Sequence, residues 1–417
     1  MRRSHRHGGA VIRRASILAA LQYRDFRLLW FGLLVSNLGT WMQFTAMGYF
    51  VARLAGSPHR AAFDLGIIGA ARAVPVLILS PLAGVVADRL RRRRVLFVTN
   101  TTMALAALAL AVLATAHRLD MTGLVLVSAV SSAAMAFDSP TRQSWVPLLV
   151  EREYVGNAVG LNSVAFNAPA VVGPALAGLL IVWIGVAGAF YFNAAATLAV
   201  VVAVMMMQPS PPSSARREST LLAMRQGIAF ILRHPALRWI ILAQLVTSLL
   251  TRPYSQLVPA LAVNLLHASA RGLGWAVSAI GIGGFGGAIV TAYFAGRERR
   301  STLWVQASIV MSIAVLGLGL VPSLAFALPL LFAAGVGTLA SLGATNTLIQ
   351  TLSPDDVRGR ALSIYTMIAI GIVPLGALVD GAIATAIGLR EMFVLAGAFC
   401  TLLFVAIWFL RPAVRAV

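Results

Sequence analysis

Residues 84–94 read Gly-Val-Val-Ala-Asp-Arg-Leu-Arg-Arg-Arg-Arg, and this short basic stretch separates two long apolar segments. The apolar segment before it is broken by Pro75 and Pro81, and the next one begins at Val95. Arginine enters the hydrocarbon of a bilayer only at a high free-energy cost, and basic loops stay on the cytoplasmic side of a membrane. The stretch therefore predicts a cytoplasmic loop between two membrane-spanning helices, and it sets the expected orientation of the chain.

The composition of the chain is typical of an integral membrane protein. Of its 417 residues, 59% are hydrophobic and only 11% are charged, which is far too apolar for a soluble globular protein. The apolar runs are about 20 residues long, as membrane-spanning helices require, whereas an outer-membrane barrel has short segments of alternating polarity. We therefore predict an all-α polytopic membrane protein.

Twelve membrane-spanning helices are expected, six on each side of a linker that begins with a Pro/Ser-rich stretch at residues 209–214. Farther along the linker, Arg225 and Arg233 alternate with apolar residues, so this segment either lies flat on the inner leaflet or forms a solvated helix. The expected organisation is a basic cytoplasmic tail at residues 1–27, an N-terminal six-helix bundle at 28–208, a cytoplasmic linker at 209–236, a C-terminal six-helix bundle at 237–411 and a cytoplasmic tail at 412–417.

The two halves also repeat in sequence. Shifting the chain by 203 positions superimposes four glycines of the first half on four glycines of the second. These matches align the fifth expected span with the eleventh, as a duplicated six-helix unit predicts. The pairs are Gly156 with Gly359, Gly173 with Gly376, Gly178 with Gly381, and Gly185 with Gly388.

The net charge of +20 does not indicate nucleic-acid binding, because of where the basic residues lie. All 33 of them are arginines, and most fall in the chain ends and in the loops expected on the inner side. This asymmetry follows the positive-inside rule, and an even number of spans then places both termini in the cytoplasm. The arginines expected in outer loops are Arg53, Arg60, Arg118, Arg271 and Arg390.

The residue types exclude several kinds of chemistry. The chain has no lysine, so it contains neither a Walker A phosphate loop nor a lysine Schiff base. Cys400 is the only cysteine, which excludes an internal disulfide and a thiolate metal cluster. We therefore expect no enzyme, no cofactor and no resident metal.

Gly84, Asp88, Arg89, Arg92 and Arg93 resemble the signature loop of the major facilitator superfamily, between its second and third helices. The loop departs from that pattern at Arg91, where the family usually has a second glycine. The resemblance implies two pseudo-symmetric six-helix bundles with the substrate site between them. Within the superfamily, the chain most resembles the bacterial efflux branch that contains the enterobactin exporter, through residues 37–43, 75–89, 137–147 and 252–259.

The resemblance implies a function in the bacterial inner membrane. It implies alternating access, with proton-driven export of a small organic molecule that is siderophore-like or drug-like. Pro169, Gly173 and Pro174 resemble the Gly-Pro motif of exporter branches, which favours efflux. The partners are then a small-molecule substrate, a proton gradient and the lipid bilayer, with no nucleic acid, and we expect a monomer. The alternatives are a sugar or metabolite permease on the same scaffold, or a non-transporting membrane sensor.

The resemblance implies that Asp88 acts as a conformational latch with Gly84, Arg89, Arg92 and Arg93. It stabilises the outward-facing state by a charge interaction across the two halves. A carboxylate near a helix N-terminus is stabilised by roughly 0.3–2 kcal/mol, so a contact that forms in only one of two states can bias the equilibrium between them. The other interpretation is that Asp88 only offsets the charge of the neighbouring arginines.

Arg72 and Arg252 are expected near the middle of their spans, where an arginine is costly unless it meets water or a partner. Either they make a basic central cavity for an anionic or polar substrate, or each makes a local pairing or a carbonyl contact near Pro75 or Pro253. The polar residues that would complete such a cavity are Asn37, Thr40, Trp41, Gln43, Tyr254 and Gln256.

Two acids are candidates for proton coupling. Asp138 is expected close to the inner mouth, where it either exchanges a proton with a cavity or pairs with Arg142. Asp380 is expected nearer the outer mouth than the middle of its span. No acid falls at the middle of a span in an obvious proton site, so proton antiport follows from the resemblance alone.

Overall fold

The computed structural model describes residues 18–208, 220–294 and 300–417, and these residues form helices joined by short turns, with no strand among them. The fold class expected from the sequence is confirmed. The long helices are α1 (Arg24–Ala55), α2 (Pro58–Arg89), α3 (Arg92–Thr115), α4 (Met121–Trp145), α5 (Val155–Met206), α6 (Thr220–Arg233), α7 (Leu237–Leu250), α9 (Ala270–Phe294), α10 (Arg300–Leu320), α11 (Leu324–Leu352), α12 (Asp355–Thr366), α13 (Val373–Ile387) and α14 (Leu389–Leu410). The short ones are η1 (Ala19–Gln22), η2 (Val146–Leu148), η3 (Arg152–Tyr154), α8 (Tyr254–Pro259), η4 (Ala260–Leu265), η5 (Met367–Gly371) and α15 (Pro412–Arg415).

Nine segments of the described chain are long and apolar enough to cross a membrane. The bent pair of Met224–Arg233 and Leu237–Leu265 gives a tenth if the pair is counted as one span. Two further crossings follow from the geometry. α5 has 52 residues and breaks at Gly185, so it supplies two crossings. α1 has 32 residues, which is long enough, but its polar side chains lower its mean apolarity. The described residues thus contain the twelve membrane-length segments that the sequence predicts.

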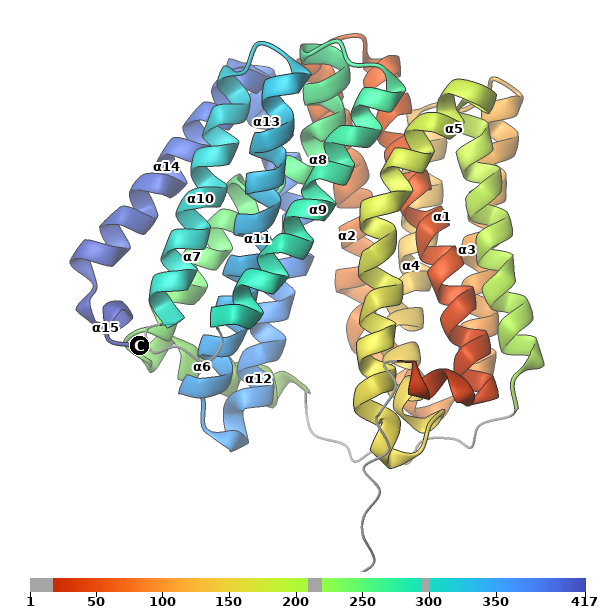
Figure 1. The fold of residues 1–417 in the computed structure, drawn as a ribbon, viewed down its shortest axis with the longest axis horizontal. Helices are drawn as coiled ribbons and strands as arrows, with labels where there is room; N and C mark the ends of the chain where they lie inside the picture. Colours follow the sequence, from red (N-terminus) through yellow and green to blue (C-terminus); the bar gives the residue numbers. More distant parts are fainter. Residues whose placement is uncertain (1–17, 209–219, 295–299) are drawn as a thin grey trace, which may run out of the picture.

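The helices form two bundles that stand side by side (Figure 1). One contains α1 to α5, and the other contains α7 to α14. The helices η1, α6 and α15 all lie at one end of the molecule, which we call the terminal face, and we call the opposite end the distal face. Residues 1–17 and 209–219, which include most of the predicted N-terminal tail and the first part of the predicted linker, lie outside the described residues.

The glycine repeat seen in the sequence recurs in the packing of the two bundles. Gly173 packs against Leu38 and Trp41 of α1, whereas its counterpart Gly376 packs against the backbone of Ser248 in α7. Each bundle therefore seats its fifth span on its first span at a glycine. Helices in a membrane gain no hydrophobic driving force from one another, so small residues that allow backbones to approach are what stabilise such contacts.

The middle of the C-terminal bundle contains two breaks in helical geometry. α7 ends at Leu250, and Pro253 precedes the short α8 and the π-helical η4. The span of α12 and α13 is interrupted by the π-helical η5 just before Pro374. Proline lacks a backbone N–H and clashes with the preceding turn, so it interrupts the hydrogen-bond ladder. Irregular backbone at membrane depth is tolerated only where protein or water surrounds it.

We predict that Gly185→Ala destabilises the fold. Gly185 has φ 74° and ψ −179°, and Gly388 has φ 110° and ψ 149°, a region of backbone conformation that is nearly restricted to glycine. An alanine at position 185 should cost about 1–3 kcal/mol. Gly160→Ala is the control, because Gly160 lies in a regular helix with no atom near an added Cβ, and it should be neutral or stabilising.

The measurement is thermal unfolding followed with a thiol-reactive dye, because Cys400 is buried and is the only cysteine. Gly185→Ala should expose Cys400 at a lower temperature than the parent. An unchanged melting temperature would show that alanine adopts the backbone conformation of position 185 without destabilising the protein.

Candidate substrate cavity and gate

A small cavity lies between the two bundles. Phe44, Met47 and Gly48 of α1 and Leu65, Ile68, Gly69 and Arg72 of α2 line it from one bundle, and Gln256 and Pro259 of α8 line it from the other. Its volume is about 20 Å³, which is room for roughly one water molecule. In this conformation the cavity is therefore too small for an organic substrate, and the bundles have to move before one can bind.

Arg72 is the charged group of this cavity. It lies at the middle of α2, and its guanidinium carbon is 5.2 Å from the centre of the Phe44 ring. Among the side chains that the structure describes, Arg72 has no acidic ion-pair partner. A cation over an aromatic face is attracted by the ring quadrupole, but its charge is not neutralised. Arg72 is thus held in place and remains able to bind an anionic group.

Arg252 does not share this cavity. It donates hydrogen bonds to the Ser248 hydroxyl, at 3.3 Å, and to the backbone carbonyl of Ala369 in η5. The two breaks of the C-terminal bundle are therefore joined by one guanidinium. A break leaves carbonyl groups without helical partners, and an arginine can satisfy them. The sequence left a shared basic cavity and a local contact open, and in this structure only Arg72 lines the cavity.

Of the six other residues expected in the cavity, some lie at it and the rest make contacts elsewhere. Gln256 lines it, and Trp41 packs edge-on against Phe44 with ring centres 5.8 Å apart. The remaining four make contacts outside the cavity in this conformation. Asn37 donates to the carbonyl of Ala165 at 2.9 Å, Thr40 donates to the carbonyl of Ser36 at 2.9 Å, Gln43 accepts from Asn193 at 2.7 Å, and Tyr254 is 2% exposed in the apolar core.

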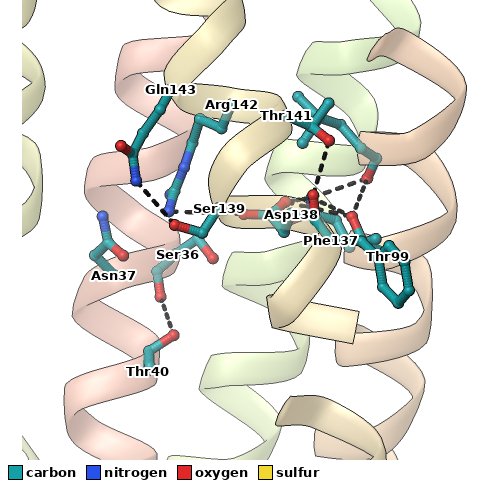
Figure 2. Close-up of polar contacts among 12 residues, drawn as sticks. Ser36, Asn37, Thr40, Thr99, Phe137, Asp138, Ser139, Thr141, Arg142 and Gln143 are labelled. Carbon is teal, nitrogen blue, oxygen red and sulfur yellow. Dashed lines mark hydrogen bonds and ion pairs between the residues drawn. The ribbon is translucent and has the colours of Figure 1, made fainter. Parts of the chain in front are cut away.

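Asp138 of α4 is held in a buried network (Figure 2). One of its carboxylate oxygens accepts from Asn100 at 2.7 Å and from Thr99 at 3.3 Å, both on α3. Its other oxygen lies 3.6 Å from a guanidinium nitrogen of Arg142. A buried carboxylate with three partners links α3 to α4, and this geometry matches the pairing alternative that the sequence left open.

Asp380 of α13 has a different environment. It is 1% exposed, and one of its carboxylate oxygens has no hydrogen-bond partner among the described residues. The next residue, Gly381, packs directly on α2, since an added Cβ would lie 2.6 Å from the carbonyl oxygen of Ala62. Asp380 is therefore a buried, incompletely bonded acid beside a contact between the two bundles.

The basic loop is described only in part. The side chains of Gly84, Asp88 and Arg89 lie outside the described part of the structure, so the latch role of Asp88 remains a prediction. Arg92 is buried and donates to the Ser144 hydroxyl at 3.2 Å, and Arg93 donates to the carbonyl of Val204 at 2.9 Å. These two arginines tie α3 to α4 and α5 within one bundle.

Two crossings close the distal half of the boundary between the bundles, and we call them the distal seams. At the crossing of α5 and α9, a Cβ on Gly178 would lie 2.7 Å from the carbonyl oxygen of Ala270. At the crossing of α13 and α2, a Cβ on Gly66 would lie 2.7 Å from the carbonyl oxygen of Ala377. Each seam therefore brings two backbones into direct contact, and no larger residue fits without displacement.

The equivalent positions toward the terminal face have no such contacts. Gly156 and Gly160 lie at the start of α5, and Gly359 lies at the start of α12. A Cβ on any of them would meet no atom within 4 Å. The bundles are thus closed against each other distally, while these glycines face open space at the terminal end.

Sequence reasoning missed the cavity residues Phe44, Gly48 and Gly69 and did not assign Gly178 and Gly381 to a gate. The glycine repeat was visible, but it was interpreted only as a sign of duplication. The signal that could have identified the gate is the recurrence of glycines near the same depth in both halves. Each of these glycines lies opposite another span that contains glycine.

A family model described as "Transmembrane secretion effector" matches residues 15–417. The chain is 27% identical over 378 residues to a protein named multidrug efflux pump Tap from Mycolicibacterium fortuitum, covering 88% of this chain and 90% of that protein. It is 23% identical over 361 residues to a staphyloferrin A transporter of Staphylococcus aureus, covering 86% of this chain and 89% of that protein. Its fold is similar to the crystal structure of a mutant of the nucleoside transporter NupG, with a TM-score of 0.73 at 14% identity, over 93% of this chain and 98% of that one.

We predict that Gly274→Ala opens the distal seams. An alanine Cβ at position 274 would lie 2.6 Å from the carbonyl oxygen of Pro174, and such overpacking costs about 1–3 kcal/mol. A shift of about 1.4 kcal/mol changes a two-state equilibrium tenfold. A reporter cysteine at Met47, in a Cys400→Ser background, should therefore react about tenfold faster with a membrane-impermeant thiol reagent from the distal side.

Gly286→Ala in the same helix is the control, because its Cβ would meet its nearest neighbour at an ordinary 3.6 Å. It should leave the labelling rate unchanged. Equal rates in the two variants would show that the glycine crossings do not hold the distal side closed.

Proposed function

Because this chain belongs to the transmembrane secretion effector family, within the major facilitator superfamily of membrane transporters, we propose that it exports a small organic molecule across a bacterial inner membrane by alternating access. The observation that carries the proposal is a cavity between two bundles whose backbones touch at the distal end, whereas Gly156 and Gly359 face open space at the terminal end. The efflux proteins among its relatives support export rather than uptake. We further propose that the terminal face is cytoplasmic, as the arginine distribution favours.

In this proposal the structure is the inward-open state. A substrate enters from the cytoplasm between the terminal halves of the bundles, and the bundles first shift to enlarge the cavity at Phe44, Arg72 and Gln256 around it. The bundles then tilt, so that the distal seams part and the surfaces around Gly156 and Gly359 meet. Contacts of glycines with the opposing backbone suit this movement, because the glycines themselves place no side chain against the other bundle. The hydrogen bond from the Ser278 hydroxyl to the Val171 carbonyl has to break as the bundles separate.

The cavity favours an amphiphilic substrate with an anionic group. Its lining is mainly apolar, which suits hydrophobic parts of a ligand, and Arg72 is its one charged side chain. Arginine binds carboxylates through paired hydrogen bonds, and Phe44 offers a ring face for stacking. A siderophore-like carboxylate and an acidic drug-like compound both fit this chemistry, and the staphyloferrin A transporter among the relatives supports the former.

We propose Asp380 as the proton-coupling acid. A charged carboxylate buried without full hydrogen bonding is costly, whereas the neutral acid is tolerated. Protonation of Asp380 therefore favours the closed distal seam, and loss of the proton favours the open one. Asp138 suits this role less well, because Arg142, Asn100 and Thr99 already satisfy its carboxylate.

The test is transport into inverted vesicles or proteoliposomes across a panel of small organic molecules, with and without an imposed pH gradient. We expect substrate movement that the gradient accelerates, and we expect Asp380→Asn to abolish the acceleration while retaining substrate binding. Asp138→Asn is the matched control, and we expect it to keep the gradient response in the fraction that folds. Transport that ignores the gradient in the parent would contradict antiport, and gradient-driven uptake into cells would indicate a permease.

We predict that Arg72→Gln weakens binding of anionic substrates selectively. Hydrogen bonds to charged groups contribute about 1.5–3 kcal/mol, so the KM for a carboxylate substrate should rise at least about tenfold. The KM for its neutral amide or ester analogue should change much less. Arg252→Gln is the comparison variant, and we expect it to lower the yield of folded protein rather than to discriminate between the two substrates.

A further inference from the structure

Helix α6 lies across the direction of the membrane-spanning helices. Its segment Met224–Arg233 is bent by 109° from the following segment Leu237–Leu265, and it lies at the terminal face (Figure 1). His234 holds the corner, since its Nδ1 atom accepts from the backbone N–H groups of Ala236 and Leu237 at 3.3 and 3.2 Å. Burial lowers the pKa of His234, which keeps the imidazole neutral and able to accept. A helix set at this angle to a spanning helix lies nearly in the plane of the membrane surface.

One face of α6 packs on α12. Gly227 is in direct contact with this helix, since an added Cβ would lie 2.7 Å from the Ile364 side chain. Arg360 of α12 donates to Gln226 at 2.5 Å, and Ile231 is 3% exposed. Helix α6 is thus attached to the first part of the span that carries Asp380 and one of the distal seams.

A second face of α6 is apolar and uncovered. Met224, Ile228 and Leu232 follow one another at intervals of four residues, so they form one stripe along the helix. Their exposed fractions are 37%, 40% and 54%. Three exposed apolar side chains in a row are unfavourable in water, which indicates that something apolar covers this stripe.

Exposed basic side chains lie on α6, on the adjoining α7 and at the end of α14, which packs on α7. Arg225 and Arg233 are exposed on α6, and Arg238 is exposed at the start of α7. Arg411, at the end of α14, is exposed, and its guanidinium carbon lies 3.9 Å from the centre of the Trp239 ring. Neither α6 nor α7 contains an acidic residue. We call Arg225, Arg233, Arg238 and Arg411 the basic rim.

We propose that the stripe of α6 and its basic rim bind anionic phospholipid of the membrane leaflet at the terminal face. An amphipathic helix in the membrane plane buries its apolar stripe at the boundary between headgroups and acyl chains. Arginines beside that stripe then reach the phosphate level, and tryptophan is typical of the same depth. The partner is an anionic headgroup because the rim carries only positive charge. Since α6 is packed on α12, bound lipid also fixes the terminal end of that span.

The experiment measures contact between the stripe and lipid directly. An environment-sensitive fluorophore is attached to Ile228→Cys in a Cys400→Ser background, and the full chain is reconstituted in phosphatidylcholine vesicles. The vesicles carry a minor fraction of either brominated phosphatidylglycerol or brominated phosphatidylcholine. We expect brominated phosphatidylglycerol to quench the fluorophore about twofold more strongly, with the difference shrinking at high salt.

The variants assign the effect to the rim. Arg225→Gln with Arg233→Gln should equalise quenching by the two lipids, whereas Lys at both positions should retain the preference because it keeps the charge. Arg118→Gln, in the turn between α3 and α4 at the distal face, is the matched control and should change nothing. Equal quenching by both lipids in the parent would overturn the choice of an anionic lipid. No quenching by either would overturn lipid contact altogether and point to water or to a second copy of the chain. Quenching reports contact and not transport, so this result is independent of the proposed function.

Discussion

The architecture depends on direct backbone contact between the two bundles at glycines. In a bilayer, lipid tails surround helices as favourably as other apolar side chains do, so bundles associate through close packing rather than through exclusion of water. The distal seams supply that packing twice, where α5 crosses α9 and where α13 crosses α2. Such a contact is suited to opening, because the glycines at the seams place no side chain between the two backbones. The alternating access that we propose requires a sealing contact that can also open.

The two bundles share the same helix arrangement but differ in their buried polar groups and in the regularity of their helices. In the N-terminal bundle, the polar groups of α3 and α4 converge on Asp138, and the network is internally complete. In the C-terminal bundle, the helices break at mid-depth, Arg252 joins the breaks, and one oxygen of Asp380 has no hydrogen-bond partner in the described part of the chain. The first arrangement favours a rigid unit. The second contains the irregular backbone and the incompletely bonded acid on which a conformational change can act, and α6 packs on that same bundle at the terminal face.

Much of the fold followed from the sequence, whereas the site followed only in part. Apolar runs of spanning length, the placement of arginines and the 203-residue repeat of glycines are one-dimensional signals, and they identified the class, the spans and the duplication. The rotation of each helix about its axis is set by packing, and one sequence does not record it. For that reason Arg72 and Arg252, which look alike in the sequence, lie in a cavity and in a helix break respectively. The pair of Asp138 and Arg142 was foreseeable because partners four residues apart share a helix face.

The most direct test of the account is a pair of distances between spin labels, measured by pulsed electron resonance in a Cys400→Ser background. One pair of labels reports the distal side, at the exposed positions His59 and Thr385, and the other reports the terminal side, at the exposed positions Glu153 and Asp355. If the two bundles tilt about a central cavity, the two distances should change in opposite directions on addition of substrate or on a change of pH. The distal distance should lengthen as the terminal distance shortens. Two distances that stay fixed, or that lengthen together, would contradict it.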